Sequence, residues 1–402
     1  MKKAGGAQVG EVLSIGAFLR TYPVGKVKTI LKETGKSSIR ERAMPNHVVV
    51  YYVLALAMFM TDSYREVMRC LLEGIRHGGR KKIDVKPLGK SGISQARARL
   101  GYEPLKRIYE EFVRPIAARK TRGAWYKQWL VVSLDGSTMD VANTPENEKS
   151  FGRHKGRRGT SAFPKIRLVS LIENGTRVLF GAVVGAYAGA NSTSEMDLAW
   201  QVITALRKGM LCLADRYYLG YEFFKAASET QADLLWRAKR NLILVPTKRL
   251  RDGSYLSQLY RSAADRKKKR DGITVRVIEY KFKWARHKEP FIRLITTILD
   301  PDTAPAKELA ALYHDRWEIE TALGEVKTRM RGADIVLRSK TPDLVRQEFY
   351  AFLLAYFSVR GVMHEAALEA NEDPDRLSFL HSVNVIRRKI PAFGIFPPAA
   401  LA

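Results

Sequence analysis

Apolar residues follow two different patterns along the chain, one up to about residue 120 and another beyond it. The first part lacks the alternation that is typical of strands, and its apolar positions recur at helical spacing. Its clearest predicted helices cover residues 9–20, 46–60, 64–76, 93–100 and 103–118. The longest apolar run, residues 48–60, has about 13 residues where a membrane span needs about 20, so it predicts a buried core helix.

From Trp129 onward, short apolar runs predict strands. Residues 129–142 begin as an apolar strand and end in polar residues, and residues 166–187 indicate two strands joined at Asn174-Gly175, a strong hairpin signal. A helix near 194–207, a strand at 210–215, a helix near 220–229 and a strand at 232–238 follow. This order predicts an α/β fold with a mixed sheet covered by helices. It fits an RNase H-like core, although other mixed sheets would give the same order.

Residues 241–299 break this alternation. They contain two predicted strands, 273–284 and 291–299, and we interpret them as a β-rich insertion in the core. A long helix is predicted from about residue 304 to 330, and the tail from Thr341 is predicted to be helical.

Charge is the unusual bulk property of the sequence. Lys and Arg number 69 against 41 Asp and Glu, which gives a net charge of +28. Such an excess repels itself unless a polyanion shares the surface, so nucleic acid is the first candidate partner and an anionic membrane the second. Four basic runs, at 152–158, 237–240, 266–270 and 387–389, would each ordinarily be a solvated surface, but together they favour double-stranded DNA.

The stretch Ser91–Leu100 has two interpretations of equal weight. Four of its residues, Ser94, Gln95, Arg97 and Arg99, are types that contact bases in a DNA groove. The same residues are typical of a basic surface helix in a helical bundle.

The two cysteines, Cys70 and Cys212, lie in apolar contexts without a metal-binding spacing. Buried thiols in a reduced compartment are the simplest explanation. Because the N-terminal residues contain no signal-like apolar stretch, we expect a cytoplasmic, nucleoid-associated protein without a membrane anchor.

Two carboxylates, Asp135 and Asp215, each end a predicted apolar strand. Ligand sites in α/β sheets gather beyond the carboxyl ends of strands, so an Asp at this place is well suited to hold a metal. Asp is also a common turn and helix-cap residue, and for either one taken alone this simpler role is the better interpretation.

A third candidate lies in the predicted helix 304–330. At about 100° per residue, four residues fall within an arc of roughly 60°: Tyr313, Arg316, Glu320 and Lys327. An apolar stripe flanks this arc, so Glu320 is predicted at the edge of the buried face in basic company. Glu318 and Glu325 fall on the opposite side and are predicted to face solvent. A surface helix held by ion pairs is the alternative, but it does not predict so narrow a polar stripe.

The spacing Tyr313-x2-Arg316-x3-Glu320-x6-Lys327 resembles the Y-R-E-K signature of IS4-family DDE transposases. The Asp-Gly-Ser that begins at Asp135 and the Asp-Arg at Asp215–Arg216 are similar to the first and second acidic motifs of that family. The second motif reads DRYY where many relatives have Gly after the Arg, so only its first two residues carry over. The resemblance covers about residues 127–335 and extends to the helical N-terminal region.

This resemblance implies an RNase H-like fold with a catalytic triad of Asp135, Asp215 and Glu320. The triad would hold two divalent ions, most naturally Mg²⁺ with Mn²⁺ as a substitute. The resemblance also implies DNA-binding roles for five residues: Tyr313, Arg316, Trp317, Lys327 and Arg216. Arg and Lys suit this role as phosphate ligands, and an aromatic ring such as Trp317 can support a flipped base.

By resemblance, the chain would be a DNA transposase that binds terminal inverted repeats, cleaves DNA and transfers the 3′ ends to target DNA, as a homodimer in a synaptic complex. Five regions are expected: a helical N-terminal DNA-binding region (1–126), the first part of the core (127–240), the β-rich insertion (241–300), the core helix with the catalytic Glu (301–340) and a helical C-terminal region (341–402). Two alternatives are a non-catalytic DNA-binding protein derived from a transposase and an RNase H-like nuclease without strand transfer.

Overall fold

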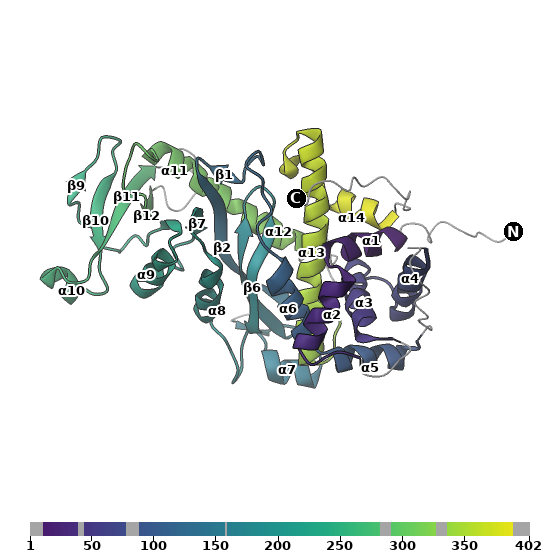
Figure 1. Cartoon of the computed structure of the whole chain (residues 1–402). Coiled ribbons are helices and arrows are strands. Elements are labelled where there is room, and N and C mark those ends of the chain that lie inside the picture. Colours follow the sequence, from purple (N-terminus) through teal and green to yellow (C-terminus); the bar gives the residue numbers. More distant parts are fainter. Residues whose placement is uncertain are drawn as a thin grey trace.

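The computed structural model describes residues 11–38, 44–77, 88–156, 159–281, 291–326 and 336–388, without the side chains of residues 11–15, 70, 73–77, 317 and 387–388. Three parts are visible in Figure 1: a group of N-terminal helices, a central sheet, and strands that continue the sheet away from the helices. The long helix α13 (Pro342–Ala370) runs between the N-terminal helices and the sheet and packs against both. Among the described residues, no helix is long and apolar enough to cross a membrane.

The described residues before the sheet form six helices: α1 (Glu11–Thr21), α2 (Val24–Glu33), α3 (Asn46–Met58), α4 (Tyr64–His77), α5 (Lys90–Leu100) and α6 (Glu103–Phe112). Helix α3 is buried along almost its whole length because α1, α2, α4, α5 and α13 surround it. This arrangement confirms the buried core helix that the apolar run predicted.

The larger differences from the prediction are one additional helix and one helix that ends early. Helix α2 was not predicted, since its apolar face contributes only Val27, Ile30 and Leu31 to the core. Helix α6 ends at Phe112 rather than near residue 118, because Pro115 disfavours helical backbone at the residue before it.

The arginines of α5 bind other parts of the protein. Arg97 is 3% exposed, and it donates hydrogen bonds to Gln347 Oε1 at 3.0 Å and to Ser339 Oγ at 2.9 Å. Arg99 donates to the Met44 carbonyl at 3.1 Å. These contacts join α5 to α13 and to the chain before α3, so they favour the bundle interpretation of this helix over a DNA-reading one.

The central sheet contains an RNase H-like core in the strand order β6-β5-β2-β7-β8. Its strands are β2 (Trp129–Asp140), β5 (Lys165–Glu173), β6 (Val178–Ala186), β7 (Met210–Ala214) and β8 (Asp233–Arg237). Strands β2, β5 and β6 are antiparallel neighbours, whereas β7 and β8 run parallel to β2. Helix α8 (Glu195–Val202) precedes β7, and α9 (Tyr221–Glu229) precedes β8. The predicted order β-β-β-α-β-α-β is therefore confirmed.

Smaller elements complete the core: β1 (Trp125–Tyr126) pairs with β2, α7 (Pro145–Phe151) follows β2, β3 (Lys155–Gly156) and β4 (Gly159–Thr160) pair with each other, and a 3₁₀ turn, η1 (Ile203–Ala205), follows α8.

The Asn174-Gly175 turn joins β5 and β6 as predicted. Gly175 has a φ of +80°, which glycine adopts at little cost, and a Cβ there would lie 2.6 Å from the Arg122 carbonyl oxygen.

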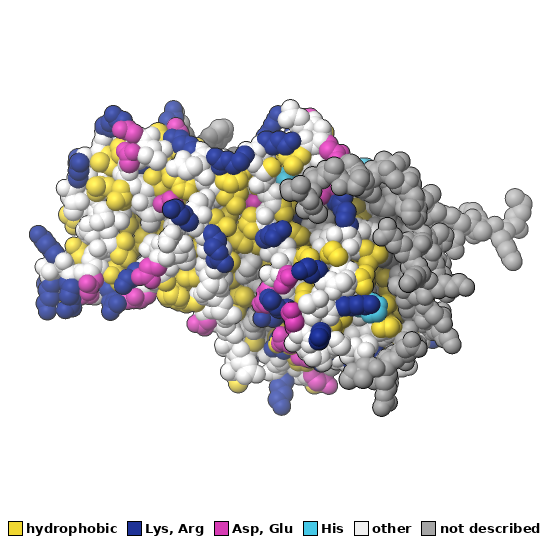
Figure 2. Space-filling view, in the orientation of Figure 1, with side chains coloured by type: hydrophobic (Ala, Val, Ile, Leu, Met, Phe, Trp, Pro, Cys, Tyr) yellow, Lys and Arg dark blue, Asp and Glu magenta, His cyan; other side chains and the backbone are white. Residues whose placement is uncertain are grey.

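The insertion after β8 continues the same sheet. It contributes β9 (Lys248–Arg249), β10 (Tyr255–Leu259), β11 (Ile273–Lys281) and β12 (Phe291–Thr296), with the short helix α10 (Ala263–Lys268) between β10 and β11. Strand β12 pairs antiparallel with β8, placing Leu294 opposite Arg237, and the two predicted strands of the insertion are β11 and β12. The basic side chains around α10 form a dark-blue cluster at the left end of Figure 2.

The predicted helix 304–330 is divided into α11 (Ala306–Leu312), the 3₁₀ turn η2 (Tyr313–Trp317) and α12 (Glu318–Gly324). One continuous α-helix was therefore a wrong prediction for this segment. After α13, the chain forms η4 (Pro374–Arg376) and α14 (Phe379–Arg388).

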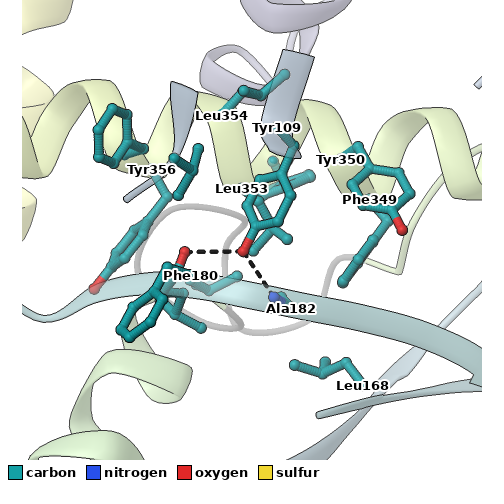
Figure 3. Close-up of a cluster of buried hydrophobic side chains, with 14 of the residues drawn as sticks. Tyr109, Leu168, Phe180, Ala182, Phe349, Tyr350, Leu353, Leu354 and Tyr356 are labelled. Carbon is teal, nitrogen blue, oxygen red and sulfur yellow. Dashed lines mark hydrogen bonds between the residues drawn. The ribbon is translucent and has the colours of Figure 1, made fainter. Parts of the chain in front are cut away.

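Aromatic residues fix α13 and α6 to the sheet. Figure 3 shows Tyr109 of α6 among Phe349, Leu353 and other apolar side chains of α13, above strand β6. Its hydroxyl donates to the Leu179 carbonyl at 3.1 Å and accepts from the Ala182 N–H at 2.9 Å. Because a buried polar group needs such partners, this contact helps to set the position of α6 on the sheet.

Candidate active site

Sheet register brings Asp135 and Asp215 together. In the parallel pair of β2 and β7, Leu134 lies beside Ala214. Asp135 follows Leu134 and Asp215 follows Ala214, so the two acids are neighbours at this point. Strand β7 ends there, but β2 continues because β5 pairs with it as far as its last residue. The prediction that Asp135 ends its strand was therefore wrong, since an antiparallel partner carries β2 through the polar residues. Asp135 does lie where the ladder with β7 ends, and Asp215 directly follows β7 as predicted.

Arg316 lies between the first and third predicted acids. Its Nη1 is 3.4 Å from Asp135 Oδ2, and its Nη2 is 3.8 Å from Glu320 Oε1. The Arg316 side chain is 11% exposed, whereas that of Glu320 is 48% exposed, so Glu320 lies at the solvent side of the group. Asp135, Arg316 and Glu320 thus meet in space beside Asp215.

Tyr313 anchors the same segment to the sheet. It is 6% exposed, and its hydroxyl donates to the Ala214 carbonyl oxygen at 3.3 Å, next to Asp215. Burial raises the pKa of Tyr313, so the hydroxyl stays protonated and remains a donor. The contact observed is one of packing, and a contact of Tyr313 with a DNA phosphate stays a prediction.

Other elements cover two acids that the helical pattern placed toward solvent, while the predicted apolar stripe of Ile319, Leu323 and Val326 stays buried. Glu318 accepts a hydrogen bond from the Gly175 N–H at 2.7 Å, and burial raises its pKa to about 7. Glu325 is 1% exposed. The prediction that both residues face solvent was wrong, because the β5–β6 turn and α13 supply partners on this side of the segment as well.

Glu325 is held by helix α13. The Tyr356 hydroxyl donates to Glu325 Oε2 at 3.0 Å, and Arg360, itself 1% exposed, forms an ion pair with the same carboxylate. Arg177 Nη1 lies 3.4 Å from the other carboxylate oxygen. Since buried charges persist only when paired and hydrogen-bonded, these contacts fix the segment that carries Glu320 against α13.

The environment of Asp135 disfavours the charged form of its carboxylate. Burial raises its pKa to about 6, and the nearby carboxylates of Glu195 and Asp215 act in the same direction. A hydrogen bond from the Gly136 N–H at 2.8 Å and the charge of Arg316 offset part of this effect. Asp135 is therefore ionised at neutral pH, at a cost in free energy that a nearby cation would reduce. Glu195 was missed from the sequence, where its only signal is a place at the start of a core helix.

The donor chemistry of this group fits a divalent metal. Carboxylate oxygens are the hard ligands that Mg²⁺ prefers, and a cation would balance the charge of Asp135, whose ionised form burial disfavours. In the part of the chain that the structure describes, no three Asp, Glu, His or Cys side chains stand close enough together to hold a metal ion. The Arg316 guanidinium explains the separation of Asp135 and Glu320, because it lies between them.

A pocket of about 440 Å³ opens beside Asp215. It is lined by Asp215, Arg216, Tyr217, Lys239, Arg240 and Asn241. Two residues of the predicted basic run 237–240 therefore lie near the candidate catalytic acids. Tyr217 is 50% exposed, so the pocket combines an accessible aromatic ring with basic side chains.

Two predicted DNA-binding residues are not placed. Lys327 lies outside the described residues, and only the main chain of Trp317 is described. Their roles stay predictions.

The sheet order β6-β5-β2-β7-β8, with Asp135 and Asp215 side by side where the β2–β7 ladder ends and Glu320 on a later helix, fits the catalytic domain of a DDE transposase. The model of the family "Transposase DDE domain" matches residues 128–358, and that of "Insertion element 4 transposase N-terminal" matches residues 12–110. The chain therefore belongs to the IS4 family of DDE transposases. As a transposase it binds DNA and cleaves it during transposition, with a divalent metal ion.

The chain is 26% identical, over 391 residues, to the transposase InsG for insertion sequence element IS4 from Escherichia coli (strain K12). This similarity covers 94% of the chain and 82% of that protein. Among solved structures, the synaptic complex of piggyBac transposase with hairpin DNA matches with a TM-score of 0.47 and 10% identity, over 93% of this chain and 79% of that one.

Proposed function

We propose that this transposase cleaves the DNA ends of its element, and joins them to target DNA, through two Mg²⁺ ions held by Asp135, Asp215 and Glu320. The observation that supports this proposal is the meeting of Asp135, Arg316 and Glu320 beside Asp215. Bound ions of this kind would activate a water or a 3′-hydroxyl and stabilise the leaving oxygen of the phosphate. Mn²⁺ would substitute, because it accepts the same oxygen ligands.

The protein groups have separate tasks in this proposal. Asp135 and Asp215 lie on neighbouring strands of one sheet, so their main chain gives the site a rigid base. Arg316 balances the charge of Asp135 in the absence of DNA, and a phosphate oxygen would replace that carboxylate as its partner when DNA binds. This exchange would release Asp135 and Glu320 to approach each other.

The DNA backbone would run along the basic wall beside Asp215. Arg216, Lys239 and Arg240 line that pocket and are suited to phosphate contacts. Tyr313, Trp317 and Lys327 belong to the same proposed surface by resemblance. Since two ends must be held together for transposition, we propose that the chain acts as a homodimer on DNA, which the mass of the complex with an end duplex would test.

Replacing Arg216 by Ala should weaken binding to any DNA duplex by a similar factor, because Arg216 is exposed and would contact phosphate rather than bases. The slope of log K against log salt concentration should fall by about 1. Fluorescence anisotropy titrations at several salt concentrations measure both quantities. Arg376→Ala is the matched control, since it removes another exposed arginine, and it should leave the slope unchanged. An unchanged slope for Arg216→Ala would place Arg216 off the DNA path.

A cleavage assay tests the proposed function. A labelled duplex that carries the end of the element, taken from the DNA flanking the gene, should be cut at the repeat boundary in Mg²⁺, yield joined products with target DNA, and remain intact in EDTA. Cutting without joining would instead indicate a nuclease without strand transfer. Salt-sensitive binding without cutting, in either Mg²⁺ or Mn²⁺, would indicate a DNA-binding protein derived from a transposase.

A further inference from the structure

The insertion carries a short helix that adds nothing to the core. Helix α10 lies between β10 and β11, and none of its side chains is buried. Local contacts hold its two ends: Ser262 Oγ accepts from the Asp265 N–H at 3.1 Å, and Arg270 Nη2 donates to Asp265 Oδ1 at 2.8 Å. Helices in proteins are stabilised mainly by packing of an apolar face, which α10 lacks. The role of α10 therefore lies in the side chains that it presents to solvent.

Four successive basic residues make up most of this exposed surface, and we call them the α10 cluster: Arg266, Lys267, Lys268 and Lys269. Among the described residues, no Asp or Glu forms an ion pair with any of the four. Lys269 ends the helix in the left-handed conformation, with a φ of +51°, which glycine would adopt at lower cost. A lysine at a position that favours glycine adds a further positive charge to the cluster, which is visible at the left end of Figure 2.

Two contacts fix the α10 segment beside the start of α9. The Tyr221 hydroxyl donates to the Asp271 carbonyl oxygen at 2.5 Å. Arg261 forms an ion pair with Glu222 at 2.5 Å, and its guanidinium lies 5.6 Å from the centre of the Tyr221 ring. Because these contacts join the turn between β10 and β11 to the first two residues of α9, the place of the α10 cluster relative to the catalytic core is defined.

The α10 cluster lies within reach of the same duplex as the catalytic acids. Tyr221 follows Asp215 by six residues, and Asp271 follows Lys267 by four. Chain and side-chain lengths therefore limit the distance between the Cα atoms of Asp215 and Lys267 to at most about 45 Å. A straight duplex covers this distance in about 13 base pairs, at about 3.4 Å per pair.

Positive charge continues from Asp215 toward the insertion. Arg216, Lys239 and Arg240 line the pocket beside Asp215, and the two residues from this set that follow β8 lie at the strand with which β12 of the insertion pairs. On the other side of the acids the sheet continues through β5 to β6, against which α13 packs, and the N-terminal helices lie beyond it (Figure 1). A duplex with its scissile phosphate at Asp135 and Asp215 would thus extend one arm toward the N-terminal helices and the other toward α10.

We propose that the α10 cluster binds the phosphates of the flanking duplex, which is the DNA outside the element and across the cut from the terminal repeat. The resemblance assigns the terminal repeat to the N-terminal region, so the arm that points toward the insertion is the flanking one. Lysine suits this contact because its point charge binds phosphate without reading bases. The inference rests on the proposed function, since it places the scissile phosphate at Asp135 and Asp215.

Anisotropy titrations of two duplexes test the proposal in EDTA, where no cutting occurs. Both carry the same element end, but one stops at the repeat boundary and the other continues into flanking DNA for about 20 base pairs, more than the reach estimated above. The parent protein should bind the longer duplex about tenfold more tightly or better. The variant Lys267→Gln/Lys268→Gln/Lys269→Asn should lose most of this gain and bind the short duplex within about twofold of the parent.

The salt dependence gives a second readout. On the longer duplex, the slope of log K against log salt concentration should fall by about 2–3 in the variant, because three phosphate contacts are lost. The variant should fold like the parent, since α10 buries no side chain and Asn tolerates the left-handed conformation of residue 269. Hydroxyl-radical footprinting should show flanking sugars protected within about 13 base pairs of the cut by the parent but not by the variant.

Two control variants separate a local contact from a change in net charge. Lys267→Arg/Lys268→Arg/Lys269→Arg keeps the charges and should keep the gain from flanking DNA. Lys26→Gln/Lys28→Gln/Lys32→Gln removes three exposed lysines from α2 and should leave that gain unchanged, whatever it does to binding of the short duplex.

The outcomes separate this proposal from the function on which it rests. A gain from flanking DNA that is absent in the parent or unchanged in the α10 variant would overturn the role of the cluster, as would an equal loss on both duplexes. A failure of the proposed active site would instead appear as DNA cleavage in Mg²⁺ that Asp135→Asn does not reduce, which the titrations in EDTA do not measure.

Discussion

Asp135→Asn is expected to reduce DNA cleavage by about 10³-fold or more while leaving the affinity for the DNA end within about twofold of the parent protein. Asn keeps the shape of the side chain and can still accept the hydrogen bond from the Gly136 N–H. It removes the negative charge that a divalent cation would need at the end of the ladder between β2 and β7. Gel-based cleavage and anisotropy titration of the same labelled duplex measure the two quantities side by side.

A neighbouring acid supplies the control for this experiment. Asp140→Asn makes the same chemical change on the same strand, at a residue that pairs with Lys165, and should leave cleavage nearly unchanged. Glu320→Gln should be as inactive as Asp135→Asn. If Asp135→Asn cut DNA at a tenth of the parent rate or faster, the assignment of the catalytic acids would have to be abandoned.

Arg360→Met should lower the free energy of unfolding by about 3 kcal/mol. Met fills a similar volume, but it leaves Glu325, which is 1% exposed, without its main ionic partner. Breaking a buried pair costs about 3–5 kcal/mol, and Arg177 at 3.4 Å keeps the effect at the lower end of that range. Urea unfolding followed by circular dichroism measures the change.

Two further variants serve as controls for the unfolding measurement. Arg376→Met removes an exposed arginine that pairs with Glu372, and its effect should stay within about 0.5 kcal/mol. The double variant Glu325→Leu/Arg360→Met should recover most of the lost stability, because apolar residues of similar volume can replace a buried ion pair. A loss below about 1 kcal/mol in Arg360→Met would mean that the pair does not fix the catalytic segment to α13.

The sequence predicted the strands of the core well because each is an apolar run bounded by turn residues. The Asn174-Gly175 hairpin and the order of strands and helices were correct for this reason. Strand β2 was predicted too short, since its polar second half is held by pairing with β5, which local composition does not reveal. The 3₁₀ turn at Tyr313–Trp317 was missed for a similar reason, because its residues are compatible with an ordinary α-helix.

The sequence indicated those residues of the candidate site whose chemical type and spacing both matched a motif. Asp135, Arg316 and Glu320 come together, and Asp215 follows β7 beside them. The burial of Glu318 and Glu325 was not predictable, because their partners Gly175 and Arg360 belong to other elements. The closeness of Glu195 to Asp135 was not predictable from the sequence, because it arises only when α8 packs on the sheet.

The pairing of β12 with β8 has a consequence for how this enzyme can be shortened or recombined. A bare sheet edge offers unpaired N–H and C=O groups to any passing strand, and β8 would be such an edge if the insertion were removed. Its central residues Leu234, Leu235 and Trp236 are apolar and fully buried, so an uncovered β8 would also favour association with the strands of other molecules. We therefore expect a catalytic core that ends at residue 240 to aggregate unless another strand covers β8.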